Sequence, residues 1–295
     1  MFRGQYDSDV TVWSPQGRLF QVEYAMEAVG LGTACVGLKS KDFAVVVGLY
    51  KPASEMGLSQ PKIIPIDQHV GICIAGITAD ARILGKYLRT ECLTYKHSYS
   101  TSYPISRLVY NLGNKMQIST QRYDRRPHGV GLLLAGYDDS GSHMYQVMPS
   151  ANVFNCKAMA IGNRSQGART YLMKHQDTFK VCSKDELICH GIQAMSYAAS
   201  IDEPLKLSIG IVGKDQPFKI LSPVESMSYQ KTCKPPDTPD ISWFPEALKE
   251  FDSSAESAMD SAAGPSTPLT ATNSQPNLSV TPKTSKNQVN NKKSS

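Results

Sequence analysis

The apolar positions in the first part of the chain change from the period of a helix to the pattern of strands. Leu19, Val22, Met26 and Val29 recur at the spacing of one helix face, directly after the turn-forming sequence SPQG at residues 14–17. Two strand pairs follow, 34–38 with 43–49 and 63–66 with 70–75. Their runs FAVVVGL and VGICIAG are apolar on both faces. Such strands must be covered on both sides, so we expect a sheet buried between layers.

Helices and strands then alternate in groups. Thr78 is a predicted N-cap with Asp80 in the first helical turn, and Pro104 opens a second helix. Ser165 is a predicted N-cap of a third helix, and SKDE at 183–186 has the spacing of a capping box. The remaining predicted strands are 130–137, 143–147, 157–161 and 205–212. This order predicts an α+β fold, a four-layer α-β-β-α sandwich with two sheets inside and helices outside.

The composition changes after about residue 220, where aliphatic residues give way to Ser, Thr, Pro, Asn and Gln. We therefore expect an N-terminal arm and turn at 1–18, a folded core at 19–220, an extension at 221–260 and a tail at 261–295. Trp243 and Phe244 lie in a stretch, 240–251, that predicts a short helix against the core. The tail contains no acidic or aromatic residue, and we expect it to be disordered because it cannot bury enough apolar surface.

The charge distribution and the cysteines limit the classes of protein to which this chain can belong. The net charge of +5 is scattered without a long basic stripe, which argues against a nucleic-acid partner. No apolar run approaches the roughly 18 residues of a membrane span, so we expect no membrane contact and a cytoplasmic and nuclear location. The seven cysteines form no C-x-x-C pair, which predicts reduced, mostly buried thiols. We expect no metal, no cofactor, and ordinary structural or surface roles for His128, His143 and His190.

The segment YDSDVTVWSPQGRLFQVEYAMEA at residues 6–28 resembles the signature of proteasome alpha-type subunits. In that signature an aromatic-Ser-Pro-x-Gly-Arg stretch precedes Gln-apolar-Glu-Tyr, and every fixed position is filled here. The resemblance continues through AGITADAR, RPHGVGLLLAGYDD, IGNRSQGARTYL and LSIGIVGKD, so it covers nearly all of the chain up to about residue 220. Within the family the opening is most similar to the type-1 subfamily, the sixth alpha position. The Ser/Thr/Asn-rich tail departs from the acidic tail usual there and suggests a paralogue.

This resemblance implies the N-terminal nucleophile hydrolase fold in a catalytically inactive form. It implies a wall and gate subunit of the outer alpha ring of the 20S proteasome, which supports ubiquitin-dependent protein degradation. The implied partners are other alpha and beta subunits in a 28-subunit hetero-oligomer and a regulatory particle such as 19S. The implied gate and bracing residues are Tyr6, Asp7, Pro15, Gly17 and Tyr24, with Tyr6 and Asp7 as an exposed pair. Where several alpha subunits have arginine after the aspartate, this chain has Ser8, so we expect that salt link to be missing.

Lys62 has two interpretations that the sequence leaves open. In the family, a lysine just before the second hairpin can meet the C-terminal carboxylate of a docking regulatory particle. The alternative is a solvated surface lysine at the start of a strand. Arg122, Arg125 and Arg126 form a small basic patch for which we expect a contact between subunits.

Two other functions compete with the ring subunit. The first is an active threonine peptidase, since Gly32-Thr33 is similar to the cleavage point of catalytic beta subunits and Lys62 matches their lysine. That chemistry needs the free amine of the threonine and a nearby acid. Thr33 follows a predicted helix, however, and Leu49 falls at the position of the aspartate. The second is a free-standing binding protein on the same fold.

Overall fold

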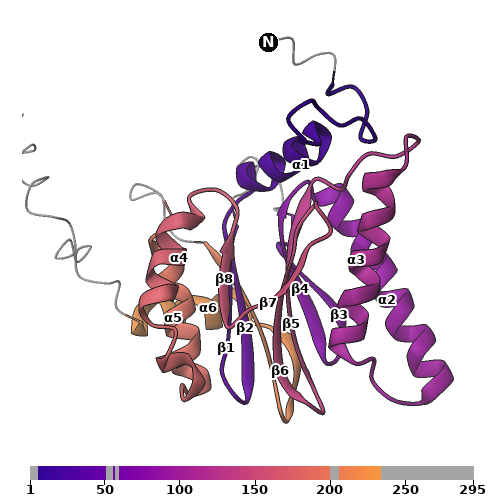
Figure 1. Ribbon diagram of the computed structural model, residues 1–295. Helices are drawn as coiled ribbons and strands as arrows, with labels where there is room; N and C mark the ends of the chain where they lie inside the picture. The colour runs from indigo at the N-terminus through magenta and orange to yellow at the C-terminus, as the bar shows by residue number, and fades with distance from the viewer. Residues whose placement is uncertain (1–5, 51–55, 57–59, 200–205, 234–295) are drawn as a thin grey trace, which may run out of the picture. The chain divides into compact units, whose positions relative to one another are not determined.

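The computed structural model describes residues 6–50, 56, 60–199 and 206–233 (Figure 1). All of them belong to one compact unit, residues 1–237. A second unit, residues 238–295, lies outside the described residues. The expected short helix at 240–251 and the tail at 261–295 fall there.

Two antiparallel sheets of five strands each form the centre of the molecule (Figure 1). The strand orders are β10-β9-β2-β1-β8 and β3-β4-β5-β6-β7. The strands are β1 (Cys35–Lys39), β2 (Phe43–Leu49), β3 (Ile63–Asp67), β4 (Val70–Gly76), β5 (Val130–Asp138), β6 (Gly141–Val147), β7 (Val153–Asn155), β8 (Ala158–Ile161), β9 (Leu207–Gly213) and β10 (Gln216–Ile220).

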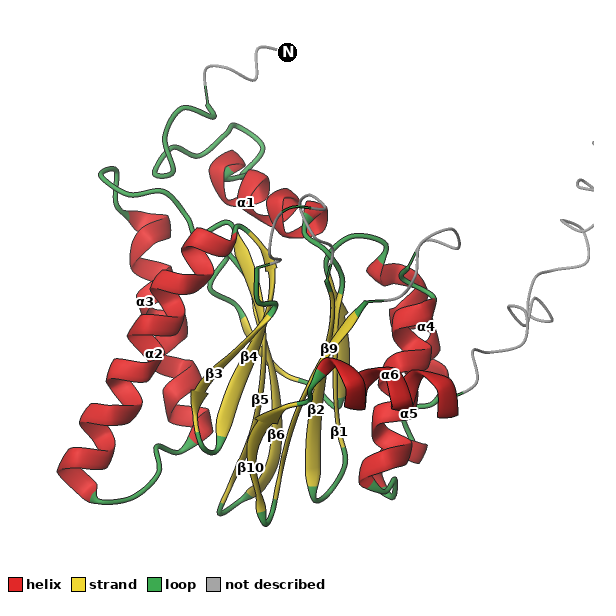
Figure 2. Cartoon of the chain, turned by 180° about the vertical axis from the view of Figure 1, so that it is seen from behind, coloured by secondary structure: helices red, strands yellow, loops and turns green. Residues whose placement is uncertain are grey.

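Helices cover the outer face of each sheet, which completes the four layers (Figure 2). The helices α2 and α3 lie on one sheet, α4 and α5 lie on the other, and α1 lies across one end of both. Their bounds are α1 (Phe20–Leu31), α2 (Thr78–Tyr99), α3 (Ile105–Gln121), α4 (Ser165–Lys174), α5 (Lys184–Ser196) and α6 (Pro223–Thr232). This arrangement confirms the predicted α-β-β-α sandwich. Within the part of the chain described here, no helix combines the length and apolar character that a bilayer crossing requires.

The core is divided into three buried clusters because the strands are apolar on both faces. In β2, Val45 and Val47 contribute to the cluster under α4 and α5, whereas Ala44 and Val46 point into the cluster between the sheets. A third cluster packs β4 and β5 against α2 and α3. Successive side chains of β2 point alternately into two interfaces that exclude water. For this reason a run such as FAVVVGL has no polar position.

Two of the predicted helix caps are corrected by the structure. Thr78 and Ser165 are the first residues of α2 and α4, and the N-cap positions before them carry no side-chain cap bond. In both places a glycine with positive φ, Gly76 at 109° or Gly162 at 95°, turns the chain between strand and helix. The capping box at Ser183 is confirmed, since its hydroxyl accepts from the backbone of the third helical residue and a glutamate bonds back.

The packed structure continues past residue 220, where we expected the core to end. Helix α6 begins with a second capping box, in which Ser222 and Glu225 bond reciprocally. These bonds, with help from Lys219, lower the pKa of Glu225 to about 2. The helix contacts β9 and α5, and the hydroxyl of Tyr229 donates to Asp185 Oδ1 over 2.8 Å.

A disulfide between Cys189 and Cys233 corrects the expectation that all thiols are reduced. Cys189 lies on α5 and Cys233 directly follows α6, and the contact between the helices brings their Cα atoms to 5.3 Å, within the range that a disulfide spans. The two cysteines are 44 residues apart in sequence, and their spacing gives no indication that they form a disulfide. Of the five free cysteines, Cys35, Cys73 and Cys92 are buried.

Candidate functional site

The arm ahead of α1 is redirected by a tight turn at residues 14–17. The Gly17 amide donates to the Ser14 carbonyl over 2.9 Å, and the Ser14 amide donates to the Arg18 carbonyl over 3.0 Å. Gly17 has a φ of 74°, a left-handed conformation that L side chains rarely adopt. Pro15 presets φ at the second position of the turn. The predicted roles of Pro15 and Gly17 in shaping this turn therefore have a direct geometric basis.

Helix α1 holds the arm at Asp7. The Tyr24 hydroxyl donates to Asp7 Oδ2 over 3.1 Å, and the Gln21 side-chain amide donates to the Asp7 carbonyl. The Tyr24 ring stacks on Phe20 at a centroid distance of 6.3 Å. Tyr6 and Asp7, which we expected to be an exposed pair, are half-buried in the structure. The reason is that α1 folds back beside the arm.

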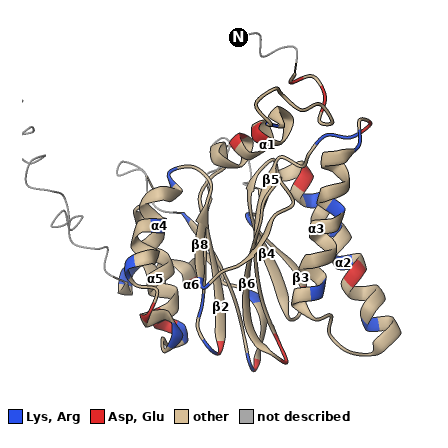
Figure 3. Ribbon diagram, in the orientation of Figure 1, with Lys and Arg blue, Asp and Glu red and all other residues tan. Residues whose placement is uncertain are grey.

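Residues 8–10 of the arm face the loop between α3 and β5. Together with Gln21 and residues 123–127 they line a hollow of about 340 Å³. Figure 3 shows the acidic part of the arm beside this basic loop. Ser8 is exposed and lines the hollow, where the arginine of other alpha subunits would add a cation.

The three arginines in the predicted basic patch all have acidic partners within the chain, and Arg122 and Arg125 share Asp124. Arg126 forms a two-pronged pair with Asp80, with nitrogen-oxygen distances of 2.6 and 2.8 Å. Asp80 also accepts from the Gly129 amide, so the pair fixes the loop to the start of α2. The hydrogen bonds from Arg126 lower the pKa of Asp80. Arg122 pairs with Asp124 at the surface, whereas Arg125 lines the hollow beside the arm.

Lys62 is half-buried and points inward at the end of α1. Its ammonium group donates to the Ile74 carbonyl over 2.9 Å and to the Thr33 carbonyl over 3.3 Å. A lysine ammonium group has three N–H donors. Within the described residues, two of them donate to backbone carbonyls. A fully solvated surface lysine is therefore a poor description of Lys62.

Two glycines near Lys62 have no room for a side chain. A Cβ atom at Gly32 would lie 2.1 Å from the Gly76 amide nitrogen, and one at Gly48 would lie 3.1 Å from Lys62 Cβ and from Cys73 Sγ. Burial and a hydrogen bond to Cys35 raise the pKa of Cys73, so this thiol is neutral. Within the described ranges, no three His, Cys, Asp or Glu side chains gather as metal ligands would.

Comparison with known proteins identifies the family. The model of the proteasome subunit family matches residues 29–212, more than half of the chain. The model of the N-terminal signature of A-type proteasome subunits matches residues 6–28, the arm, the turn and the first part of α1. The chain belongs to the proteasome subunit family. The second match places it among the alpha-type subunits.

Three relatives are named as alpha type-1 subunits of the proteasome. The protein from Drosophila melanogaster is 64% identical over 80% of this chain and 87% of its own length. The protein from Dictyostelium discoideum is 51% identical over 78% of this chain and 94% of its own length. The protein from Caenorhabditis elegans is 48% identical over 75% of this chain and 86% of its own length. The proteasome resemblance found in the sequence is confirmed.

As an alpha-type proteasome subunit, the chain is a non-catalytic structural member of the outer ring of the 20S core, whose complex is a threonine protease. The geometry around Thr33 agrees with this role. Thr33 lies between α1 and β1, so its nitrogen is part of a peptide bond and not a free amine. Lys62 contacts the carbonyl of Thr33, and Leu49 pairs with Leu207 in the sheet, where its side chain can neither orient nor balance charge.

Several contacts of this proteasome subunit were missed by reasoning from sequence. Gln21 and Asp80 hold the arm and the neighbouring loop, yet neither was assigned a role there. Asp80 was interpreted only as a first-turn acid, because its partner Arg126 lies 46 residues away. Gln21 stands inside the family signature, and its fixed position was the one available signal.

Proposed function

We propose that the chain occupies the alpha type-1 position of the 20S proteasome, where it forms part of the ring wall and contributes an arm to the gate. The observation that carries this proposal is the arm itself, which α1 holds at Asp7 and the turn at residues 14–17 aims. The alpha type-1 names of the relatives support the choice of position.

The proposal includes the assembly in which the chain works. It joins other alpha and beta subunits in a 28-subunit particle that receives a regulatory particle such as 19S, and it acts in the cytoplasm and the nucleus. Support comes from membership of the proteasome subunit family and from the arm, which Gln21 and Tyr24 of α1 hold at Asp7.

The gate part of the proposal concerns how far this arm closes the pore. Asp7 is tied to the helix of its own chain through Gln21 and Tyr24. Ser8 supplies no charge-assisted link to a neighbour. We therefore assign this arm an accessory part in closure, with several arms acting cooperatively.

Deletion of residues 1–9 tests the gate. We expect higher basal hydrolysis of a small peptide by latent particles, and an unchanged rate when an activator holds the pore open. Tyr24→Phe is a matched variant, because it removes only the hydroxyl bound to Asp7 and keeps the ring against Phe20. It should raise basal hydrolysis less than the deletion does. Basal rates equal to wild type in both variants would remove the gating role.

The docking part of the proposal concerns Lys62, whose half-buried ammonium lies among backbone carbonyls at the end of α1. A carboxylate that reaches it would form a charge-assisted hydrogen bond worth about 2 kcal/mol. Lys62→Ala should therefore weaken binding of a C-terminal peptide of the regulatory particle by roughly tenfold or more. Lys86→Ala on the exposed face of α2 is the control. Equal affinities in Lys62→Ala and wild type would leave Lys62 with a structural role alone.

A further inference from the structure

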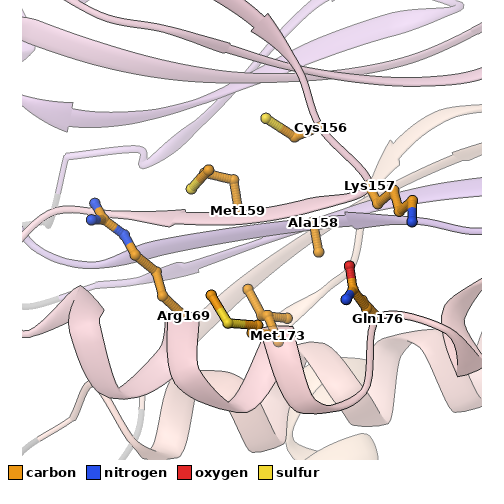
Figure 4. Close-up of a pocket in the computed structure, with 8 residues that line it drawn as sticks. Cys156, Lys157, Ala158, Met159, Arg169, Met173 and Gln176 are labelled. Atoms are coloured by element: carbon orange, nitrogen blue, oxygen red, sulfur yellow. The ribbon is translucent and has the colours of Figure 1, made fainter.

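A groove runs along the open edge of one sheet, between strand β8 and the segment formed by α4 and the short helix η2 (Thr178–Lys180) (Figure 4). It consists of two adjoining hollows of about 310 and 330 Å³ that share Lys157 and Gln176. None of its lining residues belongs to the arm, and Lys62 is not among them.

The charged side chains that line the groove are all cationic. Lys39, Lys41, Lys157 and Lys180 surround one hollow, and Arg169 lies at the far end of the other (Figure 4). The lysines come from the end of β1, the β1–β2 turn, the start of β8 and η2, so the fold gathers cations from segments far apart in sequence. Asp42 and Asp177 adjoin lining residues in sequence, but no acidic residue is among those that line the groove, and this balance favours an anionic partner.

Lys39 lines the groove, but its ammonium group is directed toward the other sheet. It donates to Asn155 Oδ1 of β7 over 3.1 Å and to the Ser142 carbonyl of β6 over 3.4 Å. The exposed lysines of the groove are Lys41, Lys157 and Lys180, and these are the ones available to a partner.

Apolar side chains fill the part of the groove between the cationic ends. Met173 of α4 lines the groove, whereas Met159 of β8 points away from α4 and packs against the cluster between the two sheets (Figure 4). Met173 is 72% exposed, an unusual state for an apolar side chain beside a hollow. Methionine adapts its shape to a partner more readily than branched side chains do, so Met173 can accommodate one apolar side chain of variable form.

The backbone of β8 also faces the groove. At the start of β8, the Lys39 amide of β1 donates to the Lys157 carbonyl over 3.0 Å. The next residue, Ala158, lies opposite Leu38 of β1. In an antiparallel ladder, alternate residues point away from the partner strand, so the amide and carbonyl of Ala158 point away from β1. The next outward carbonyl, that of Ala160, accepts from Arg169 Nε over 2.8 Å. An extended segment can therefore pair with β8 at Ala158.

We propose that this groove binds an extended acidic peptide segment of a partner protein. Its Asp and Glu side chains lie toward the lysine cluster, one apolar side chain lies against Met173, and its backbone pairs with Ala158. A simple anion such as phosphate would use the lysines but neither the apolar centre nor the strand edge. The combination of all three features selects a peptide.

Fluorescence anisotropy with the full-length chain tests the proposal. The probe is a labelled nonapeptide of Asp and Glu with a central Leu. Lys157→Glu/Lys180→Glu should weaken its binding by about tenfold or more, since each reversed charge faces the acidic probe. Both lysines are exposed, so folding is expected to persist, and a thermal melt verifies this. The matched control is Lys86→Glu/Lys96→Glu on the exposed face of α2, which should bind as wild type does.

Changes in the probe separate a peptide site from an anion site. Replacing the central Leu by Ser should weaken binding several-fold, and replacing all Asp and Glu by Asn and Gln should abolish it. Equal binding by the Leu and Ser probes, with full displacement by inorganic phosphate at a similar concentration, would show an anion site and overturn the proposal. Equal loss of binding in the two double lysine variants would overturn it as well, because the effect would then be net charge.

Discussion

Thr33 is the residue whose environment decides between a catalytic and a structural role for this chain. Its nitrogen is blocked by the preceding chain, and the lysine that would tune a nucleophile is bonded to its carbonyl. We expect Thr33→Ala to leave the three peptidase activities of purified particles unchanged. The measurement is hydrolysis of three peptide substrates by particles isolated through this chain. Selective loss of one activity in intact particles would assign catalysis to this chain.

Asp80 is the buried acid that fixes the loop beside the arm. It is 3% exposed and bonded to Arg126 and Gly129, but the Arg126 side chain is 63% exposed, which weakens the pair. We expect Asp80→Asn to lower the free energy of unfolding by about 2 kcal/mol at neutral pH. Asp124→Asn, which breaks the exposed pair with Arg122, should lower the free energy of unfolding much less than Asp80→Asn does. Urea denaturation of the full chain measures both.

The pH dependence of the Asp80 contribution follows from the direction of its pKa shift. Arg126 holds the folded pKa of Asp80 below the unfolded value, which is about 4. The stabilisation is therefore fully present above about pH 4 and is lost as the pH falls through the folded pKa. The difference between wild type and Asp80→Asn should shrink over that acidic range. A constant difference from neutral to acidic pH would mean that the charge of Asp80 does not stabilise the fold.

At the residue scale, sequence reasoning found the positions whose chemistry is local and missed those that depend on distant partners. Pro15 and Gly17 form a turn whose residues are adjacent, and the signature defines it. The contact of Asp7 with Tyr24 joins residues 17 apart, and nothing in the spacing shows that α1 folds back beside the arm. For the same reason the bond between Lys62 and the Thr33 carbonyl was not foreseen.

Helix α6 is the element whose attachment the structure explains most directly. Its capping box, the Tyr229–Asp185 bond and the Cys189–Cys233 disulfide all hold it to the molecule. A cross-link that closes a loop of 44 residues stabilises by about 4 kcal/mol. Cys189→Ala should therefore speed hydrogen exchange in Pro223–Thr232 by tenfold or more. The readout is mass spectrometry of that segment, with Cys156→Ala as control. Unchanged exchange would show that packing alone holds the helix.

The elements that the sequence predicted are those with strong apolar periodicity. Strands such as β2 and β4 and helices such as α3 are buried along most of one side or both, so their pattern is clear. The edge strands β7 and β10 were missed because they are short and half-exposed, and polar residues interrupt their pattern. Helix α6 buries little apolar surface of its own, so its cap was the only local signal.

At the scale of the whole molecule, the part needed for assembly should end soon after α6. Composition predicts that the tail does not contribute to folding. We expect a chain truncated after Phe251 to enter particles as wild type does. Truncation after Leu221 removes α6 and should reduce incorporation strongly. Co-purification with tagged beta subunits measures both, and failure of the longer version would place an assembly contact in the tail.

The central claim is that the chain is a structural member of the ring and not a free-standing binding protein. Sedimentation of tagged full-length chain from cells, followed by peptidase assay of each fraction, tests it most directly. The account predicts that nearly all of the chain sediments with a large particle that carries peptidase activity. A chain found mainly as a small free species, apart from that activity, would contradict it.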